Sequence, residues 1–143
     1  MKRTPETGCV LGTGIDLVEN DRMKETLAEW DGRFRTRVFL EDEQRYCESK
    51  AEPWRHYAGR FAVKEAVSKA FGTGVGEHIG WLDIEVLRDP DTGAPEVRLS
   101  EKGRKLAASR GVHRVLASLS HTRHYAVAHA LLVGESSGGS NRP

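Results

Sequence analysis

The sequence predicts an α+β domain in which a largely antiparallel sheet packs with one long helix and several short ones. Segments with strand-like composition stand near both ends of the chain, and a long helical pattern lies between them. Two pairs of predicted strands are joined by short polar turns, which favours antiparallel pairing. A mixed element order of this kind is typical of the α+β class. The chain shows neither a repeat at solenoid spacing nor a boundary between two domains.

The composition is typical of a globular domain with a substantial core, because 30% of the 143 residues are charged and 38% are hydrophobic. The net charge of +1 gives no overall basic field, so we expect no nucleic-acid partner. Cys9 and Cys47 form no CxxC pair and are expected as free thiols in a reducing compartment. There is no secretory pattern and no apolar run long enough to span a membrane, so we expect a cytoplasmic protein without a membrane partner.

Residues 10–18 are predicted to form a strand because they are rich in β-branched and aliphatic side chains. Ile15 and Leu17 point to one side of this strand, and Asp16 points to the other. An aspartate is unfavourable within a strand, so two interpretations of Asp16 stay open. It lies at a sheet edge or strand end facing water, or it is a carboxylate held rigidly for a metal.

A helix is predicted over about 21–30, with Asn20 as its N-cap and an apolar stripe of Met23, Leu27 and Trp30. Residues 41–47 also look helical, with an acidic first turn. The segment between them, 33–39, is the most basic region of the chain together with Arg22 and Lys24. This basic region is either ordinary solubilising surface or a dock for an acidic partner.

The longest helical pattern begins at Pro53, where the missing N–H of proline costs little, and ends at a glycine-rich loop over 72–76. At about 100° per residue, one arc of this helix is apolar and is predicted as core: Ala62, Val63, Ala66, Val67, Ala70 and Phe71. The other arc holds Phe61, Lys64, Glu65, Ser68 and Lys69. Glu65 and Lys69 are one turn apart, which fits a solvated ion pair. Phe61 within the polar arc indicates instead that this face is covered.

The C-terminal half is predicted to contain a hairpin, a short helix and two further strands. The hairpin consists of strands over 81–87 and 95–99 with a turn at 89–93, and Ser100 caps a helix that runs to about 109. The last strands cover 113–120 and 125–133. We expect a single domain over 9–133, between a flexible leader at 1–8 and a flexible tail at 134–143.

The residues that could carry chemistry are a strand carboxylate, a helix carboxylate and a lysine one turn after it: Asp16, Glu65 and Lys69. Two carboxylates on rigid elements can share one Mg²⁺, which usually takes its remaining oxygens from water and phosphate. Lysine supplies a point charge for phosphate, and glycine-rich backbone supplies N–H donors. These residue types favour a Mg²⁺-dependent enzyme acting on a phosphate or pyrophosphate. No Walker A, GxGxxG or HExxH motif is present.

Three motifs give the sequence a family resemblance that covers roughly residues 10–133. They are Gly14-Ile15-Asp16-Leu17-Val18-Glu19, then Phe61-Ala62-Val63-Lys64-Glu65-Ala66 followed by Ser68 to Gly74, and finally Ser120-His121-Thr122 with Tyr125-Ala126. In this order and at these separations they resemble the motifs of the holo-acyl-carrier-protein synthases. These are the short members of the 4′-phosphopantetheinyl transferase superfamily, so the resemblance also implies a phosphopantetheinyl transferase-like fold.

The resemblance implies transfer of the 4′-phosphopantetheine arm of coenzyme A to a serine of an apo acyl carrier protein, with release of 3′,5′-ADP. The carrier, a small acidic protein, would belong to fatty acid or polyketide synthesis. Two other functions stay open on the residues alone. One is a Mg²⁺-dependent nucleotide pyrophosphohydrolase, and the other is a non-catalytic coenzyme A-binding module. The family likeness also implies a homotrimer with its active sites between subunits.

The resemblance assigns roles to particular residues of this chain. Asp16 and Glu65 match the Mg²⁺ ligands, and Glu65 and Lys69 match positions near the reacting phosphates. The matches to coenzyme A-binding positions are Arg60, Lys69, Gly72, Thr73, Gly74, His121 and Thr122. Arg22 and Arg33 match carrier-docking positions, whereas Glu19 and Glu43 are expected to be structural caps or ion-pair members. The general base is either Glu65 or a water on the metal.

Overall fold

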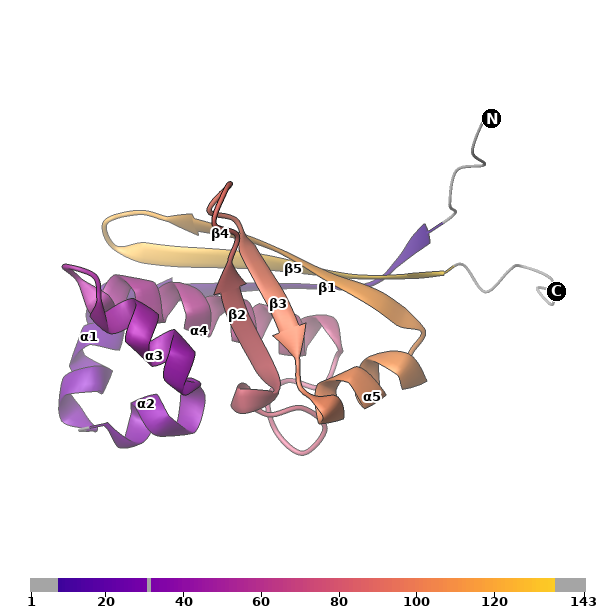
Figure 1. The fold of residues 1–143 in the computed structure, drawn as a ribbon, viewed down its shortest axis with the longest axis horizontal. Helices are drawn as coiled ribbons and strands as arrows, with labels where there is room; N and C mark the ends of the chain where they lie inside the picture. Colours follow the sequence, from indigo (N-terminus) through magenta and orange to yellow (C-terminus); the bar gives the residue numbers. More distant parts are fainter. Residues whose placement is uncertain (1–7, 31, 136–143) are drawn as a thin grey trace, which may run out of the picture.

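The computed structural model describes residues 8–30 and 32–135, and it has the predicted α+β architecture (Figure 1). A three-stranded antiparallel sheet has the order β1-β5-β4, with β1 at Gly8–Glu19, β4 at Val112–His121 and β5 at Tyr125–Glu135. A separate antiparallel hairpin contains β2, Ile84–Arg88, and β3, Pro95–Leu99. The expectation of a largely antiparallel sheet is therefore confirmed.

One long helix, α4 at Pro53–Ala70, packs along β1 and β5. The shorter helices α1, α2 and α3 gather near the N-terminal half of α4, and α5 lies at the far end of the hairpin (Figure 1). Their bounds are Asn20–Glu29, Arg33–Val38, Glu41–Glu48 and Glu101–Ser109. The long helix α4 also packs against α1, α3, β2 and β4, so it is the central element of the fold.

The close approach of α4 to β1 depends on two glycines of the strand. A Cβ on Gly14 would overlap the carbonyl oxygen of Ala66, and one on Gly12 would overlap the carbonyl oxygen of Ala70. Because glycine has no Cβ, the helix backbone can lie directly against the strand. Asp16, the next residue on the same side of β1, is thereby brought against α4.

The predicted core arc of α4 is confirmed, because Ala62, Val63, Ala66, Val67, Ala70 and Phe71 all belong to one buried cluster with the sheet and the hairpin. A second cluster joins α1, α2 and α3 to the N-terminal half of α4, and Phe39 and Tyr57 lie at its centre with ring centroids 4.8 Å apart. The two clusters hold opposite ends of α4, so the helix is fixed along its whole length.

The polar arc of α4 is less exposed than its composition suggests, because Lys64 and Ser68 are fully buried. The Lys64 ammonium donates to Glu43 Oε1 at 2.7 Å and to the carbonyls of Trp81 and Ile84 at 3.0 and 2.8 Å. All three donors of the ammonium are therefore satisfied. Burial lowers the pKa of Lys64, and the Glu43 charge opposes this shift.

Glu43 is the structural residue that the sequence predicted, and it is both a cap and an ion-pair member. It accepts the Leu40 N–H at the start of α3 and the Val86 N–H of β2, each at 2.8 Å, in addition to Lys64. A buried ion pair that loses one partner typically costs about 3–5 kcal/mol. This ion pair therefore fixes α3 and the hairpin to the polar face of α4.

Three local predictions are wrong. Trp30, predicted in the apolar stripe with Met23 and Leu27, is the C-cap of α1 and is 50% exposed. Asn20 is the first residue of α1 rather than its N-cap; Glu19 takes the cap position without a side-chain capping bond. The buried Asn20 amide instead donates to the carbonyls of Thr122 and Arg123, at 3.1 and 3.0 Å, and so ties α1 to the β4–β5 turn. The strand predicted over 81–87 begins only at Ile84, because Trp81–Asp83 form a 3₁₀ turn, η1.

Other boundaries agree with the sequence or extend it. Ser100 caps α5 as predicted, accepting the Gly103 N–H at 3.1 Å. β1 starts at Gly8 and β5 ends at Glu135, so both strands reach into the segments predicted as leader and tail. The remainder of those segments, 1–7 and 136–143, lies outside the described residues.

Cys9 and Cys47 are free thiols, as predicted. Cys47 is fully buried, and burial raises the pKa of its thiol to about 12, so it stays protonated at neutral pH. Across residues 8–30 and 32–135, no helix combines the length and the apolarity needed to cross a membrane.

Gly14→Ala should lower the free energy of unfolding by about 3 kcal/mol or more, because the new Cβ would overlap helix backbone that cannot rotate away. Gly76→Ala is the matched control, since a Cβ there meets no atom within 4 Å. Urea unfolding followed by circular dichroism measures both values. Equal stability of the two variants would contradict the close-packing argument.

Candidate active site

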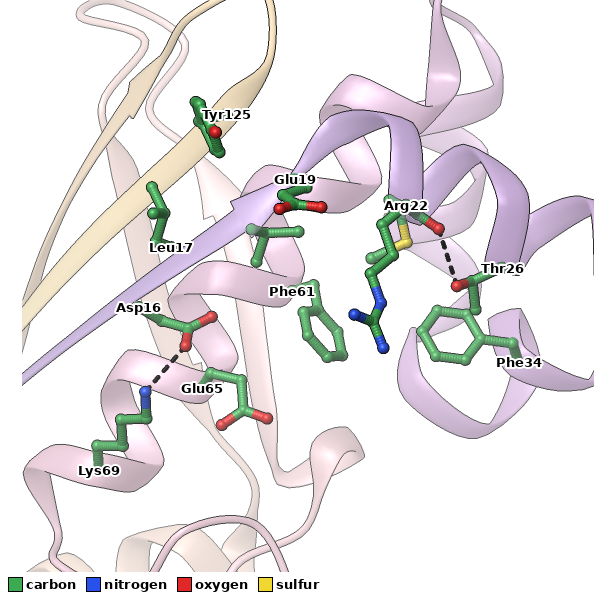
Figure 2. Close-up of a pocket in the computed structure, with 12 residues that line it drawn as sticks. Asp16, Leu17, Glu19, Arg22, Thr26, Phe34, Phe61, Glu65, Lys69 and Tyr125 are labelled. Carbon is green, nitrogen blue, oxygen red and sulfur yellow. Dashed lines mark hydrogen bonds and ion pairs between the residues drawn. The ribbon is translucent and has the colours of Figure 1, made fainter.

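Asp16, Glu65 and Lys69 converge at the wall of an open pocket of about 680 Å³ (Figure 2). The pocket lies between β1, α1, α2 and α4, and Tyr125 of β5 borders it. Asp16 comes from the strand and the other two from successive turns of the helix. The structure thus brings together the three residues that the sequence singled out for phosphate and metal chemistry.

Asp16 faces the helix, although β1 is an edge strand of the sheet. Its side chain is only 15% exposed, and its Oδ1 accepts from Lys69 Nζ at 2.9 Å. Lys69 also donates to the carbonyl of Ile15 at 3.2 Å. The water-facing interpretation of Asp16 is therefore wrong, and Lys69 pairs with Asp16 instead of forming the solvated pair with Glu65.

Glu65 lies next to Asp16 on the pocket wall, and its carboxylate extends away from the Asp16–Lys69 pair (Figure 2). Within residues 8–30 and 32–135, its carboxylate has no hydrogen-bond or ion-pair partner. Burial raises the pKa of Glu65, and the nearby Asp16 charge raises it further, while Lys69 acts in the opposite direction. The hydrogen bond to Asp16 is the main cause that raises the pKa of Lys69. Among the described residues, Glu65 thus stays unpaired beside the Asp16–Lys69 ion pair, which leaves this part of the pocket wall with excess negative charge.

A divalent cation would relieve this excess, and Asp16 and Glu65 are the residues that could hold it. In the described part of the chain, no group of three or more His, Cys, Asp or Glu side chains is arranged to hold a metal ion. A cation with only these two protein ligands would keep water or ligand oxygens in its other positions. Magnesium prefers this kind of coordination, so the residues present fit the predicted metal.

The rest of the pocket is largely apolar, and most of its lining was not predicted from the sequence. Phe61 stacks on Trp81 with ring centroids 4.8 Å apart and lies 6.0 Å from the ring of Phe34. Met23 and Thr26 of α1 also line the pocket. Phe61 was the only sequence signal for this wall, because an aromatic residue in a polar arc indicates a covered face.

Arg60 and His121 lie in a second pocket, of about 350 Å³, which shares no lining residue with the first. Arg60 and Glu65 are five positions apart on α4, so their side chains leave the helix about 140° apart. The Arg60 guanidinium lies 4.1 Å from the ring centroid of Tyr46, and its buried Nε has no hydrogen-bond partner among the described residues. Within one chain, the structure does not bring these two residues to Asp16 and Glu65.

The glycine-rich loop ends α4 and lines neither of these two pockets. Gly72 and Gly74 have φ angles of 79° and 65°, which favour glycine. Their N–H groups donate to the carbonyls of Lys69 and Ser68, so they cap the helix and are not free donors. The Thr73 hydroxyl donates to the Gly74 carbonyl.

Thr122 and the predicted docking arginines occupy three different places. Thr122 closes the β4–β5 turn, where its N–H donates to the Tyr125 carbonyl at 2.8 Å. Arg22 lines the first pocket beside Thr26 and Phe34 (Figure 2). Arg33 borders a separate open hollow with Arg37. Only Arg22 is thus placed next to the carboxylates.

A sequence profile of the 4′-phosphopantetheinyl transferase superfamily matches residues 12–130. The chain belongs to this superfamily. It is 47% identical over 120 residues to a holo-(acyl-carrier-protein) synthase of Ruminiclostridium cellulolyticum, a match covering 83% of this chain and 89% of that one. A synthase of the same name from Chlamydia trachomatis is 44% identical over 85% of this chain and 98% of its own length.

Solved structures of such synthases share the fold of this superfamily member. The Neisseria meningitidis protein aligns with a TM-score of 0.81 at 27% identity, covering 87% of this chain and 98% of that one. A Bacillus anthracis synthase, solved in complex with CoA (3′,5′-ADP), gives a TM-score of 0.72 at 36% identity over 89% of this chain and 98% of its own. The predicted family, its fold and the expectation of an enzyme are confirmed.

Glu65→Gln in this transferase-family protein should raise the midpoint of thermal unfolding at pH 7 in EDTA. Folding raises the pKa of Glu65 above its ordinary value of 4.5, so the folded state disfavours the carboxylate. At pH values below the ordinary pKa of Glu65, this cost in folding free energy is absent. At pH values above the raised pKa, the cost is complete. The difference from wild type should therefore shrink as the pH falls to 4.5 and below.

Glu77→Gln is the control for this measurement, because Glu77 is exposed and its loss should leave the midpoint nearly unchanged at both pH values. Differential scanning calorimetry in matched buffers gives the midpoints. A Glu65→Gln protein less stable than wild type at pH 7 would show that Glu65 is a stabilising carboxylate.

Proposed function

We propose that the protein transfers the 4′-phosphopantetheine arm of coenzyme A to a serine hydroxyl of an apo acyl carrier protein, with Mg²⁺ as cofactor and 3′,5′-ADP as the second product. The convergence of Asp16, Glu65 and Lys69 in one pocket carries the proposal. The family membership supports it, as do the names of the relatives and the coenzyme A bound to a Helicobacter pylori synthase of 30% identity.

In the proposed reaction, the serine Oγ attacks the β-phosphorus of coenzyme A, and the P–O bond to the leaving 3′,5′-ADP breaks. Asp16 and Glu65 would hold Mg²⁺, whose charge would neutralise the negative charge that builds on the pyrophosphate. Lys69 offers a point charge to the same phosphates once it leaves Asp16. The proton of the serine goes to Glu65 or to a water oriented by a carboxylate.

We propose that the nucleotide end of coenzyme A lies in the pocket of Arg60 and His121. Arg60 offers a buried donor that has no partner among residues 8–30 and 32–135, and Lys50 and Arg88 add positive charge to the lining. Gly72, Thr73, Gly74 and Thr122 remain proposed contacts on the strength of the family motifs. Because the two loop glycines cap α4, we expect the loop to contribute through its shape rather than through their N–H groups.

We also propose that the protein is a homotrimer whose active sites lie between copies. On the face of the β1-β5-β4 sheet that points away from α4, Ile15 and Leu17 are 61% and 62% exposed within the described residues, beside the polar Thr13–His129 pair. Leu116 of β4 and Tyr125 of β5 extend this face. An exposed apolar sheet face favours association. Association would also let the first pocket of one chain meet the second pocket of another.

The carrier is proposed to dock through Arg22, which lies at the mouth of the first pocket, and through Arg33 on the neighbouring basic helix α2. An acidic carrier protein is complementary to this charge. The site would act in the cytoplasm on a carrier of fatty acid or polyketide synthesis.

Intact-mass spectrometry of an apo acyl carrier protein tests the transfer. Incubation with this protein, coenzyme A and Mg²⁺ should add one phosphopantetheine arm to the carrier. EDTA and Glu65→Ala should each reduce the rate by at least about 10³-fold, because charge stabilisation of this kind is worth several kcal/mol. Glu77→Ala is the control and should keep the wild-type rate.

The same reactions separate the two alternatives. A pyrophosphohydrolase would cleave coenzyme A or another nucleotide without any carrier, and the carrier mass would stay unchanged. A coenzyme A-binding module would give no product in any reaction, and its affinity would survive Asp16→Ala and Glu65→Ala. Either result, with a folded protein and several apo carriers, would overturn the transferase proposal.

Complementation tests the shared site. Glu65→Ala and Arg60→Gln should each be inactive alone, yet trimers assembled from an equal mixture should recover about a quarter of the wild-type activity. In a random trimer, one site in four combines an intact Glu65 with an intact Arg60 from the next chain. Mixed trimers isolated by co-expression and tandem purification should recover about a third, because each has one such site in three. No recovery in these mixed trimers would place both residues in one chain's site.

A further inference from the structure

His56 of α4 lies one turn before Arg60 and lines the second pocket, although no sequence motif pointed to it. Its ring centroid is 6.3 Å from that of His121 on β4 and 5.8 Å from that of Tyr46 on α3. The pocket therefore has two imidazoles on facing elements. Such a pair can hold an anion between its rings once both are protonated.

The groups that face this pair are cationic or neutral. Tyr46 and Lys50 come from α3 and the turn after it, Arg60 from α4, Arg88 from β2 and His121 from β4, and Arg55 is close enough to affect both rings. No carboxylate lines the pocket. Glu43 in the adjoining hollow is held by Lys64, and Glu52, four positions before His56, is paired with Arg55.

The surroundings of His56 and His121 disfavour a positive charge on either imidazole. Burial is the main cause that lowers the pKa of both histidines. For His56 the charge on His121 lowers it further, and the neighbouring arginines add to the effect on both rings. A phosphate dianion would reverse this balance, because an adjacent negative charge favours the imidazolium form. The buried Arg60 Nε, which lacks a hydrogen-bond partner among the described residues, independently indicates a missing anionic ligand.

We propose that His56 is a ligand-binding residue of the second pocket, and that with His121 it takes up a proton from solvent when a phosphate monoester enters. No covalent bond changes in this step. The inference rests on the proposed function only in naming the ligand, which would be the phosphate-bearing nucleotide end of coenzyme A. Affinity there should rise as the pH falls, because the bound state holds more protons than the free state.

Isothermal titration calorimetry with 3′,5′-ADP tests the proposal on the whole protein in EDTA. Titrations at one pH in buffers of different ionisation enthalpy report the number of protons taken up. Between pH 7 and 8.5, where the phosphate itself is almost fully dianionic, the Kd should increase by up to about tenfold per pH unit for each linked proton. Adenosine, which has no phosphate, should bind without proton uptake.

His56→Gln should remove a large part of the uptake and flatten the dependence of Kd on pH. His56→Phe keeps the aromatic contact with Tyr46 and should do the same, which guards against a folding defect in the first variant. His124→Gln is the matched control, because His124 is exposed and lines neither pocket. This control should keep the full uptake.

The outcomes distinguish this inference from the function it rests on. Proton uptake that persists in both His56 variants but disappears in His121→Gln would assign the linkage to His121 alone and overturn the role of His56. Tight binding without any uptake, together with normal carrier modification, would overturn the inference and leave the transferase proposal intact. Failure of 3′,5′-ADP to bind the wild-type protein would overturn both.

Discussion

The close contact between α4 and β1 is the constraint on which the first pocket depends. Gly12 and Gly14 leave room for the carbonyls of Ala70 and Ala66, so helix and strand backbones lie in direct contact. Asp16 and Glu65 are separated by 49 positions in the sequence, yet this contact places their carboxylates beside one another. Any side chain at Gly14 would move them apart. The conformational freedom of glycine is incidental here, and the absent Cβ is what matters.

The opposite side of α4 is held by charge rather than by apolar packing. Lys64 is adjacent to Glu65 in the sequence, but its ammonium is buried and its three donors are used by Glu43 and two carbonyls. A fully satisfied buried pair restricts rotation and sliding of the helix, because any movement would leave a charge without partners. The carboxylate of Glu65 is therefore presented to the pocket by a helix that is anchored at the preceding residue.

Sequence patterns predicted the strands, the long helix and the three residues of the first pocket, because each has a local signal. The period of α4 marks its core arc, and the aspartate within a strand and the glutamate before Ser68 and Lys69 stand out chemically. The errors concern side-chain hydrogen bonds that the local pattern does not show. Asn20 looks like an N-cap, but its amide is used by the turn at Thr122 and Arg123. The alternation over 81–87 cannot reveal that the Gly80 N–H donates to Asp83 Oδ2 at 2.7 Å, so that a 3₁₀ turn comes first and the strand begins only at Ile84. His56 was also missed, because the sequence alone does not distinguish it from a histidine on a solvated helix face.

One helix carries both halves of the proposed coenzyme A site, and its geometry limits how they can be used. Side chains that leave α4 about 140° apart cannot meet on one side of it, whatever rotamers they adopt. A ligand that touches both Glu65 and Arg60 must therefore wrap around the helix or bridge two copies of the chain. The sheet packs on one side of α4, and α3 and the hairpin contact another. We therefore favour the proposed bridge between copies, and the exposed side chains at Ile15 and Leu17 would favour packing of their sheet faces.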